Sequence, residues 1–216
     1  ASLGTAPFIN QIAMMIVQIV MNHVMGYYGA QSIYGADIPI TCAGIISKVN
    51  GICFSFVIGI SQGLQPIISF NYGARNYKRV KDAYRLAIKL AACITTLSWL
   101  AFQLFPRQIV SIFGSGSELY FDFCTKYFRI FLFGICTAFL QPLSSNFFTA
   151  IGKPYKGIFM SLTRQVLFLT PLIICLPMIF GFNGVLYAGP IADILSFVVC
   201  FILVRMEFNR PEFSNL

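Results

Sequence analysis

The chain has 216 residues, of which 57% are apolar and only 10% are charged, and its formal net charge is +8. A soluble globular domain carries about a quarter charged residues, so this composition excludes a water-soluble globule and predicts an all-α membrane protein. The positive charge does not indicate a nucleic-acid-binding protein, because the cations gather in short loops between apolar runs, next to lipid headgroups.

Six apolar runs predict six transmembrane helices, at about residues 7–27, 38–70, 84–105, 127–151, 158–180 and 185–204. Together they predict one six-helix lobe over residues 1–206, followed by a cytoplasmic tail at 207–216. Between the third and fourth runs, Pro106 opens a short amphipathic segment that we expect at the outer membrane interface.

The cations alternate between the two sides of the predicted bundle. The loops at 28–36 and 181–184 carry no Lys or Arg, whereas the loop at 71–83 has four and the next basic connector has Lys153 and Lys156. Cytoplasmic loops are enriched in Lys and Arg, so the pattern predicts a multi-pass membrane protein with both ends cytoplasmic. We expect its location to be the plasma membrane.

A polar stripe marks the first predicted span. Gln11, Gln18 and Asn22 follow one face of the helix, with Met14 and Met15 between them. Such a stripe faces protein or water instead of lipid. It fits either interhelical hydrogen bonding or the wall of a substrate cavity.

The second predicted span contains residues that bend a helix. Gly59, Gly63 and Pro66 lie beside Gln62 and Gln65, just before the most basic loop. In lipid, backbone N–H and C=O groups that lose their helical hydrogen bonds must find partners on neighbouring helices or in a water-filled cavity. The stretch therefore predicts either structural packing or a hinge, with the two glutamines as further candidates for the cavity wall.

The fourth predicted span is unusually polar in its inner half, where Gln141, Ser145 and Asn146 occur together. Small hydroxyl residues allow helices to approach closely, so packing is one interpretation of this cluster. The other is that these three side chains complete the cavity wall.

The last two spans contain one cation and one carboxylate at membrane depth. Arg164 lies about two turns into the fifth span, and Asp193 is the only acid deep in any span. Asp193 either carries the coupling ion, Na⁺ or H⁺, or forms a structural pair with Arg164. Pro171 and Pro190 interrupt these spans and are further hinge candidates.

The sequence has seven cysteines but no Cys-x-x-Cys pair, and we expect them to be small buried hydrophobic residues. A single histidine excludes a histidine-rich metal site. No nucleophile–base pair or phosphate loop is present, so we expect neither an enzyme nor a cofactor. Because the chain opens at Ala1 beside an apolar run, we expect it to be a piece of a longer protein.

Several motifs resemble the multidrug and toxic compound extrusion (MATE) family of transporters. The main one is Gly59-x-x-Gln62-Gly63-x-Gln65-Pro66-Ile67-Ile68-x-Phe70-Asn71-Tyr72-Gly73-Ala74. The others, in the expected order, are Phe105-Pro106, Phe148-x-Ala150-Ile151-Gly152-Lys153-Pro154 and Ala188-x-Pro190-Ile191-Ala192-Asp193. Together they cover nearly the whole chain and align it with the second of the family's two six-helix lobes.

The resemblance implies half of a multidrug efflux transporter that exports small organic, mainly cationic, molecules by alternating access against a Na⁺ or H⁺ gradient. It also implies an N-terminal lobe as partner. Some branches of the family carry coupling acids in the first and fourth helices of this lobe. Gln11, Gln18, Gln141 and Asn146 occupy those stripes here, which implies coupling in the other lobe or at Asp193.

Two alternatives stay open. A lipid-linked oligosaccharide flippase of the same superfamily usually has a more cationic cavity than this sequence predicts. A non-transporting membrane scaffold subunit would need no polar residues at membrane depth, so Gln18, Gln141 and Asp193 count against it.

Overall fold

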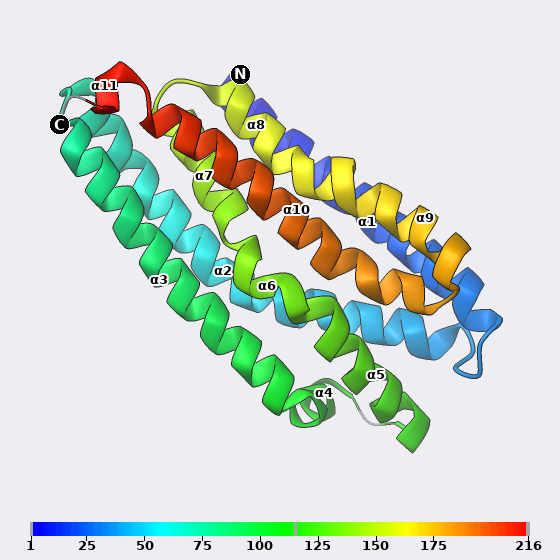
Figure 1. Ribbon diagram of the computed structural model, residues 1–216. Helices are drawn as coiled ribbons and strands as arrows, with labels where there is room; N and C mark the ends of the chain where they lie inside the picture. The colour runs from blue at the N-terminus through cyan, green and yellow to red at the C-terminus, as the bar shows by residue number, and fades with distance from the viewer. Residues whose placement is uncertain (1, 115, 215–216) are drawn as a thin grey trace.

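The computed structural model describes residues 2–114 and 116–214, and the side chains of 2–7, 9, 10, 212 and 214 lie outside this description. The described part contains six helices that are long and apolar enough to cross a membrane, at Gln11–Ala30, Asp37–Gly73, Tyr77–Leu104, Glu118–Ala150, Pro154–Phe180 and Asn183–Phe208. These match the six predicted runs, so the all-α fold with six spans is confirmed. Figure 1 shows them as one elongated bundle.

The first three spans are uninterrupted helices: α1 (Ser2–Ala30), α2 (Asp37–Gly73) and α3 (Tyr77–Leu104). Pro66 lies inside α2 without ending it. The turn into α3 is tight, with Arg75 in the left-handed region at φ 58° and Asn76 accepting a hydrogen bond from the Arg79 N–H at the helix start. The α2–α3 pair therefore forms a closely packed hairpin.

The expected interfacial segment is α4 (Pro106–Phe113), which begins at a proline. The fourth span then follows in four pieces: α5 (Glu118–Phe131), the 3₁₀ turn η1 (Leu132–Gly134), α6 (Ile135–Ala138) and α7 (Leu140–Ala150). The break before α7 lies where Pro142 has no N–H to donate to the carbonyl of Ala138.

The fifth span changes helix type along its length. It consists of α8 (Pro154–Leu162), the π-helix η2 (Thr163–Leu169) and α9 (Thr170–Phe180). The Thr170 N–H donates to the carbonyl of Gln165, five residues earlier, and its hydroxyl donates to the same oxygen at 2.8 Å. Pro171 follows directly and has no N–H to donate to the carbonyl four residues before it. The helix therefore forms a wider turn here, with hydrogen bonds that span five residues.

The last span is α10 (Asn183–Phe208), and a short turn, α11 (Pro211–Ser214), follows it. Helix α10 approaches the fourth span at Gly134, where an added Cβ would lie 2.7 Å from Cβ of Asp193 and 2.9 Å from Cα of Pro190. Any larger residue at 134 would therefore push α10 away from the bundle.

The basic connectors gather at one end of the bundle, which Figure 1 shows at the upper left together with both termini. We call it the basic end; it carries the connectors 74–76 and 151–153 and helix α11. The loop at 31–36, helix α4 and the α9–α10 connection lie at the opposite end. This segregation is the one that the loop charges predict; which end faces the cytoplasm stays a prediction.

The segment predicted as a cytoplasmic tail, 207–216, packs against the bundle where the structure describes it. Phe213 is fully buried, and its ring lies 5.2 Å from Tyr77 and 5.4 Å from Phe208, centroid to centroid. Its carbonyl accepts a hydrogen bond from Lys81 Nζ at 2.7 Å. The described part of this segment therefore closes the basic end.

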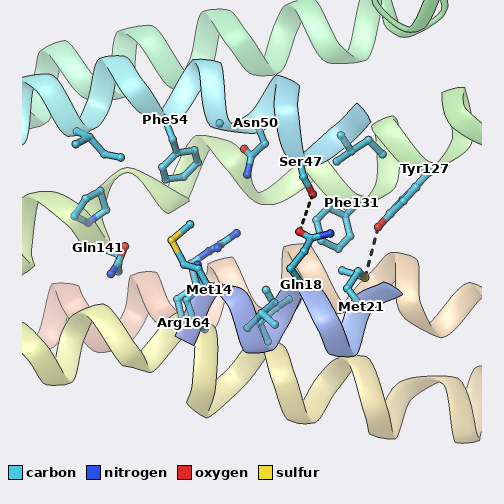
Figure 2. Close-up of a pocket in the computed structure, with 17 residues that line it drawn as sticks. Met14, Gln18, Met21, Ser47, Asn50, Phe54, Tyr127, Phe131, Gln141 and Arg164 are labelled. Atoms are coloured by element: carbon cyan, nitrogen blue, oxygen red, sulfur yellow. Dashed lines mark hydrogen bonds between the residues drawn. The ribbon is translucent and has the colours of Figure 1, made fainter. Parts of the chain in front are cut away.

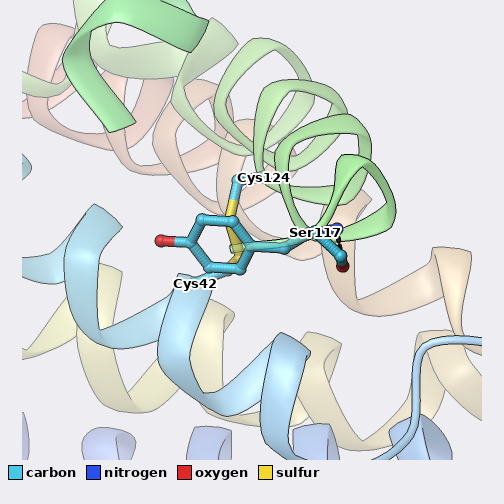
Figure 3. The surroundings of a disulfide bond; sticks show 4 residues. Cys42, Ser117 and Cys124 are labelled. Atoms are coloured by element: carbon cyan, nitrogen blue, oxygen red, sulfur yellow. Dashed lines mark hydrogen bonds between the residues drawn. A yellow bond between two sulfur atoms is a disulfide. The ribbon is translucent and has the colours of Figure 1, made fainter. Parts of the chain in front are cut away.

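A disulfide joins Cys42 of α2 to Cys124 of α5, with 5.6 Å between the two Cα atoms (Figure 3). Both positions lie near the end opposite to the basic connectors. The expectation that the cysteines are only buried hydrophobic residues is therefore wrong for this pair. The two are separated by 82 residues, so no local spacing motif could reveal them. The other five, Cys53, Cys93, Cys136, Cys175 and Cys200, are free thiols. Of these, Cys200 is buried, whereas Cys93 and Cys175 are exposed, so the expected burial is wrong for them.

Candidate substrate cavity

A cavity of ≈ 260 Å³ opens between α1, α2, the fourth span and the π-helix η2, at mid-length of the bundle (Figure 2). Helix α1 contributes Met14, Val17, Gln18 and Met21. Their spacing of three and four residues places them on one face of the helix. The α1 wall therefore combines soft apolar side chains with one amide.

Gln18 is held by its neighbours on both sides. Its Nε2 donates to Oδ1 of Asn22 at 3.1 Å, and its Oε1 accepts a hydrogen bond from Ser47 of α2 at 3.4 Å (Figure 2). Asn22 thus supports the cavity wall without lining it. The remaining stripe residues, Gln11 and Met15, are exposed and do not line the cavity.

Across from α1, helix α2 contributes Ser47, Asn50 and Phe54 to the wall. Sequence reasoning did not include these residues among the cavity candidates. The available signal was the polar pair Ser47 and Asn50, whose spacing of three residues places both on one helix face. Oδ1 of Asn50 is buried and has no hydrogen-bond partner among the described residues.

The fourth span contributes two aromatic rings and one amide, from Tyr127, Phe131 and Gln141. The Tyr127 hydroxyl points at the sulfur of Met21, 3.8 Å away (Figure 2). Gln141 Nε2 donates to the carbonyl of Met160 at 3.3 Å. Together with Phe54, the two rings give the cavity flat apolar surfaces.

The other polar residues of α7 lie outside the cavity and connect helices. Ser145 is hydrogen-bonded to the Ser161 hydroxyl at 2.7 Å and to the Gly157 carbonyl at 2.8 Å, which joins α7 to α8. Asn146 donates to the Ser61 hydroxyl at 2.8 Å, and Ser61 donates to the Pro142 carbonyl at 2.8 Å. These bonds correspond to the packing alternative for Ser145 and Asn146.

The candidate residues at the end of α2 also lie away from the cavity. Gln62 and Pro66 are exposed, Gln65 is partly buried, and none of the three lines the cavity. An added Cβ at Gly59 or Gly63 would meet no atom within 4 Å. This face of α2 is therefore open in the isolated lobe, and the hinge role of these residues, of Pro171 and of Pro190 stays a prediction.

Arg164 and Asp193, the cation and the carboxylate predicted at membrane depth in the last two spans, form a pair. Arg164 Nε donates to Oδ1 of Asp193 at 2.5 Å, and the side chains are 10% and 4% exposed. Arg164 lies in η2 and lines the cavity, whereas Asp193 does not. The Arg164 guanidinium carbon also lies 6.0 Å from the centre of the Phe54 ring. The expected structural pair is therefore present, and a coupling role for Asp193 stays a prediction.

Comparison with known protein families gives a direct result. The MatE family model matches residues 7–175. This chain belongs to the MATE family. Among curated relatives, it is 22% identical over 197 residues to an FAD transporter of Shewanella oneidensis, covering 91% of this chain and 41% of that protein. It is 20% identical over 208 residues to the multidrug export protein MepA of Staphylococcus aureus, covering 96% of this chain and 44% of that one.

Solved structures of MATE transporters show the same fold. The outward-facing conformation of a multidrug resistance MATE transporter matches with a TM-score of 0.85 at 19% identity, over 94% of this chain and 45% of that one. The MATE multidrug transporter DinF-BH, solved as a complex, matches with a TM-score of 0.81 at 28% identity, over 97% of this chain and 45% of that one. The chain thus spans less than half the length of these MATE proteins and corresponds to one lobe.

Proposed function

We propose that this chain is one lobe of a MATE-type efflux transporter that exports small organic molecules by alternating access, driven by a Na⁺ or H⁺ gradient. The observation that carries the proposal is the cavity of ≈ 260 Å³ at mid-length of an apolar bundle, with Gln18, Asn50 and Gln141 in its wall. A scaffold subunit needs polar groups at this depth only to join helices, whereas a transporter also needs them in a cavity wall to bind its cargo.

The exposed polar side chains beside the cavity support a second lobe as partner. Gln11 and Ser47 are exposed on α1 and α2, and Gln62 is exposed further along α2. Amide and hydroxyl groups do not face acyl chains at this depth, so protein or water must cover them in the assembled transporter. A six-helix partner lobe would cover this face and complete the cavity between the two halves.

The position of the acids bears on the coupling ion. Among the described residues, Asp193 is the only carboxylate at mid-span, and its Oδ1 is already bound to Arg164. A carboxylate held by a guanidinium is a poor site for Na⁺ or H⁺, because the bound cation must compete with the positive charge already there. We therefore propose that the partner lobe binds the coupling ion.

The names of the relatives support a small organic cargo: one is an FAD transporter and another is a multidrug export protein. The test uses cells that express the full-length transporter and cells with an empty vector, each loaded with rhodamine 6G or carboxyfluorescein. Expression should lower the retained dye for at least one of them, and collapse of both the Na⁺ and the proton gradient should abolish the difference. Equal retention of both dyes in the two cell lines would contradict the proposed export.

A further inference from the structure

We propose that Arg164 forms an anion-binding subsite in this half of the cavity, so that the transporter takes organic anions with a carboxylate or phosphate group. This inference rests on the proposed transport function and names its substrate class. It differs from the expectation of mainly cationic substrates that the family resemblance implies.

The first argument is the orientation of the Arg164 side chain. Asp193 takes the hydrogen bond from Nε, on the side of the guanidinium that faces α10. No described residue accepts a hydrogen bond from the two terminal amino groups, and Figure 2 shows the side chain reaching into the cavity. The terminal N–H groups form the fork that binds a carboxylate or phosphate with two parallel hydrogen bonds.

The second argument is the charge of the wall. Arg164 is the only charged residue among the described residues that line the cavity, and no carboxylate lines it. Asp193 lies behind Arg164, with its side chain 4% exposed. An organic cation entering this half would meet a guanidinium before any negative charge. An organic anion would gain charge-assisted hydrogen bonds from the terminal amino groups that Asp193 does not bind, and these bonds must outweigh the repulsion from the Asp193 carboxylate behind them.

The third argument is the set of groups around Arg164. The Phe54 ring lies 6.0 Å from the guanidinium carbon and offers a flat surface for an aromatic part of the ligand. Asn50 lines the same cavity, although its Oδ1 is buried and has no hydrogen-bond partner among the described residues. The guanidinium and the neighbouring ring therefore fit an anion that carries a planar aromatic part.

The test compares two dyes with similar ring systems and opposite charge: carboxyfluorescein, which carries carboxylate groups, and rhodamine 6G, a cation. Binding to the purified full-length transporter in detergent is measured by fluorescence anisotropy. The double variant R164Q/D193N removes both charges, so that neither remains buried without a partner. D193N alone keeps the guanidinium, and R85Q is the matched control, because Arg85 pairs with Asp82 on the exposed surface at 3.8 Å.

We expect the wild type and R85Q to bind carboxyfluorescein more tightly than rhodamine 6G, and D193N to keep this preference. R164Q/D193N should bind carboxyfluorescein about tenfold more weakly or worse, since it loses a charge-assisted hydrogen bond, and its rhodamine 6G affinity should not fall. Phenyl phosphate and benzoate, added to the wild type, should displace carboxyfluorescein, and the stronger competitor identifies the preferred acid. This competition needs no variant, so a misfolded variant leaves the test decisive.

Tighter binding of rhodamine 6G by the wild type, or equal losses of both dyes in the double variant, would overturn the anion subsite. So would the absence of competition by both aromatic acids. These outcomes are separate from failure of the proposed function, because a protein can export rhodamine 6G and lack the subsite. Conversely, carboxyfluorescein bound through Arg164 but never exported would contradict transport and leave the subsite in place.

Discussion

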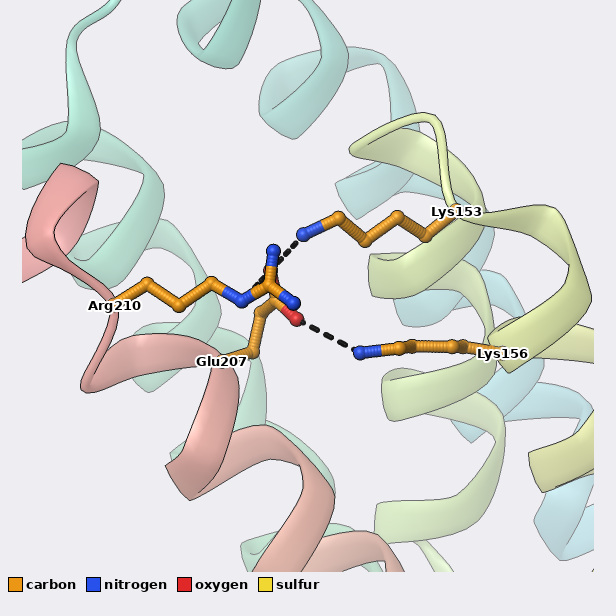
Figure 4. A network of polar contacts seen from close by, with 4 residues as sticks. All are labelled: Lys153, Lys156, Glu207 and Arg210. Carbon is orange, nitrogen blue, oxygen red and sulfur yellow. Dashed lines mark hydrogen bonds and ion pairs between the residues drawn. The ribbon is translucent and has the colours of Figure 1, made fainter.

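Lys156 donates a hydrogen bond to the carboxylate of Glu207 at 3.2 Å, which ties the start of α8 to the last turn of α10 (Figure 4). Lys153 donates a hydrogen bond to the other oxygen of the same carboxylate, Oε1, and Nε of Arg210 lies 3.4 Å from Oε1. Glu207 is only 1% exposed, whereas its three partners are 24–43% exposed. One buried carboxylate therefore organises three cations at the basic end.

We expect Glu207→Gln to lower the free energy of unfolding by about 2 kcal/mol, because the three cations then repel one another without a counter-charge. The measurement is denaturant unfolding of the full-length protein in detergent. Asp82→Asn is the control, since the Asp82–Arg85 pair is exposed and is expected to contribute less than about 0.5 kcal/mol. Equal stability of the two variants would show that the buried carboxylate has no special role.

The close approach at Gly134 predicts a steric effect. Gly134→Ala places a Cβ 2.7 Å from Cβ of Asp193 and 2.9 Å from Cα of Pro190. Because backbone atoms cannot move aside as flexible side chains do, we expect a loss of stability of about 1–3 kcal/mol. Thermal unfolding measures it. Gly63→Ala meets nothing within 4 Å, and we expect it to gain about 0.5–1 kcal/mol of helix stability.

The disulfide predicts a covalent link that mass spectrometry can detect. Proteolysis without reductant should release one species that contains both Cys42 and Cys124, and reduction should split it in two. We expect Cys42→Ser to lower stability by about 2–4 kcal/mol. Cys53→Ser is the control, because Cys53 is a free thiol. Recovery of both peptides separately before reduction would show that the bond does not form.

The loop charges predict that the basic end faces the cytoplasm, and single introduced cysteines test this. Gln31 lies at the opposite end and Lys78 at the basic end, and both are exposed. In intact cells, an impermeant maleimide should label Gln31→Cys and leave Lys78→Cys unlabelled until the membrane is opened. The reverse pattern would invert the proposed orientation of the lobe.

The six spans were predictable because hydropathy is a property of each run by itself. The same holds for α4, whose proline and amphipathic pattern are local signals at Pro106–Phe113. The π-helix was not predictable. Pro171 signals a disturbance of the helix, but its form depends on the bonds made at Thr170 and Gln165. A simple kink and a wider turn share the same sequence signal.

The cavity wall was predictable only in part, because a polar residue in a span has several possible partners. Gln18 and Gln141 line the cavity, but Asn146, in the same polar stretch as Gln141, faces Ser61 of α2. The sequence alone does not show which helix each polar side chain will face, because that depends on how the helices pack. Cys42 and Cys124 illustrate the same limit, since their meeting depends on how α2 crosses α5.

The bond between Cys42 and Cys124 also restricts how this lobe can deform. It fixes the separation of α2 and α5 near the end that carries no basic connectors. Any separation of α2 from the fourth span must therefore grow with distance from these two cysteines.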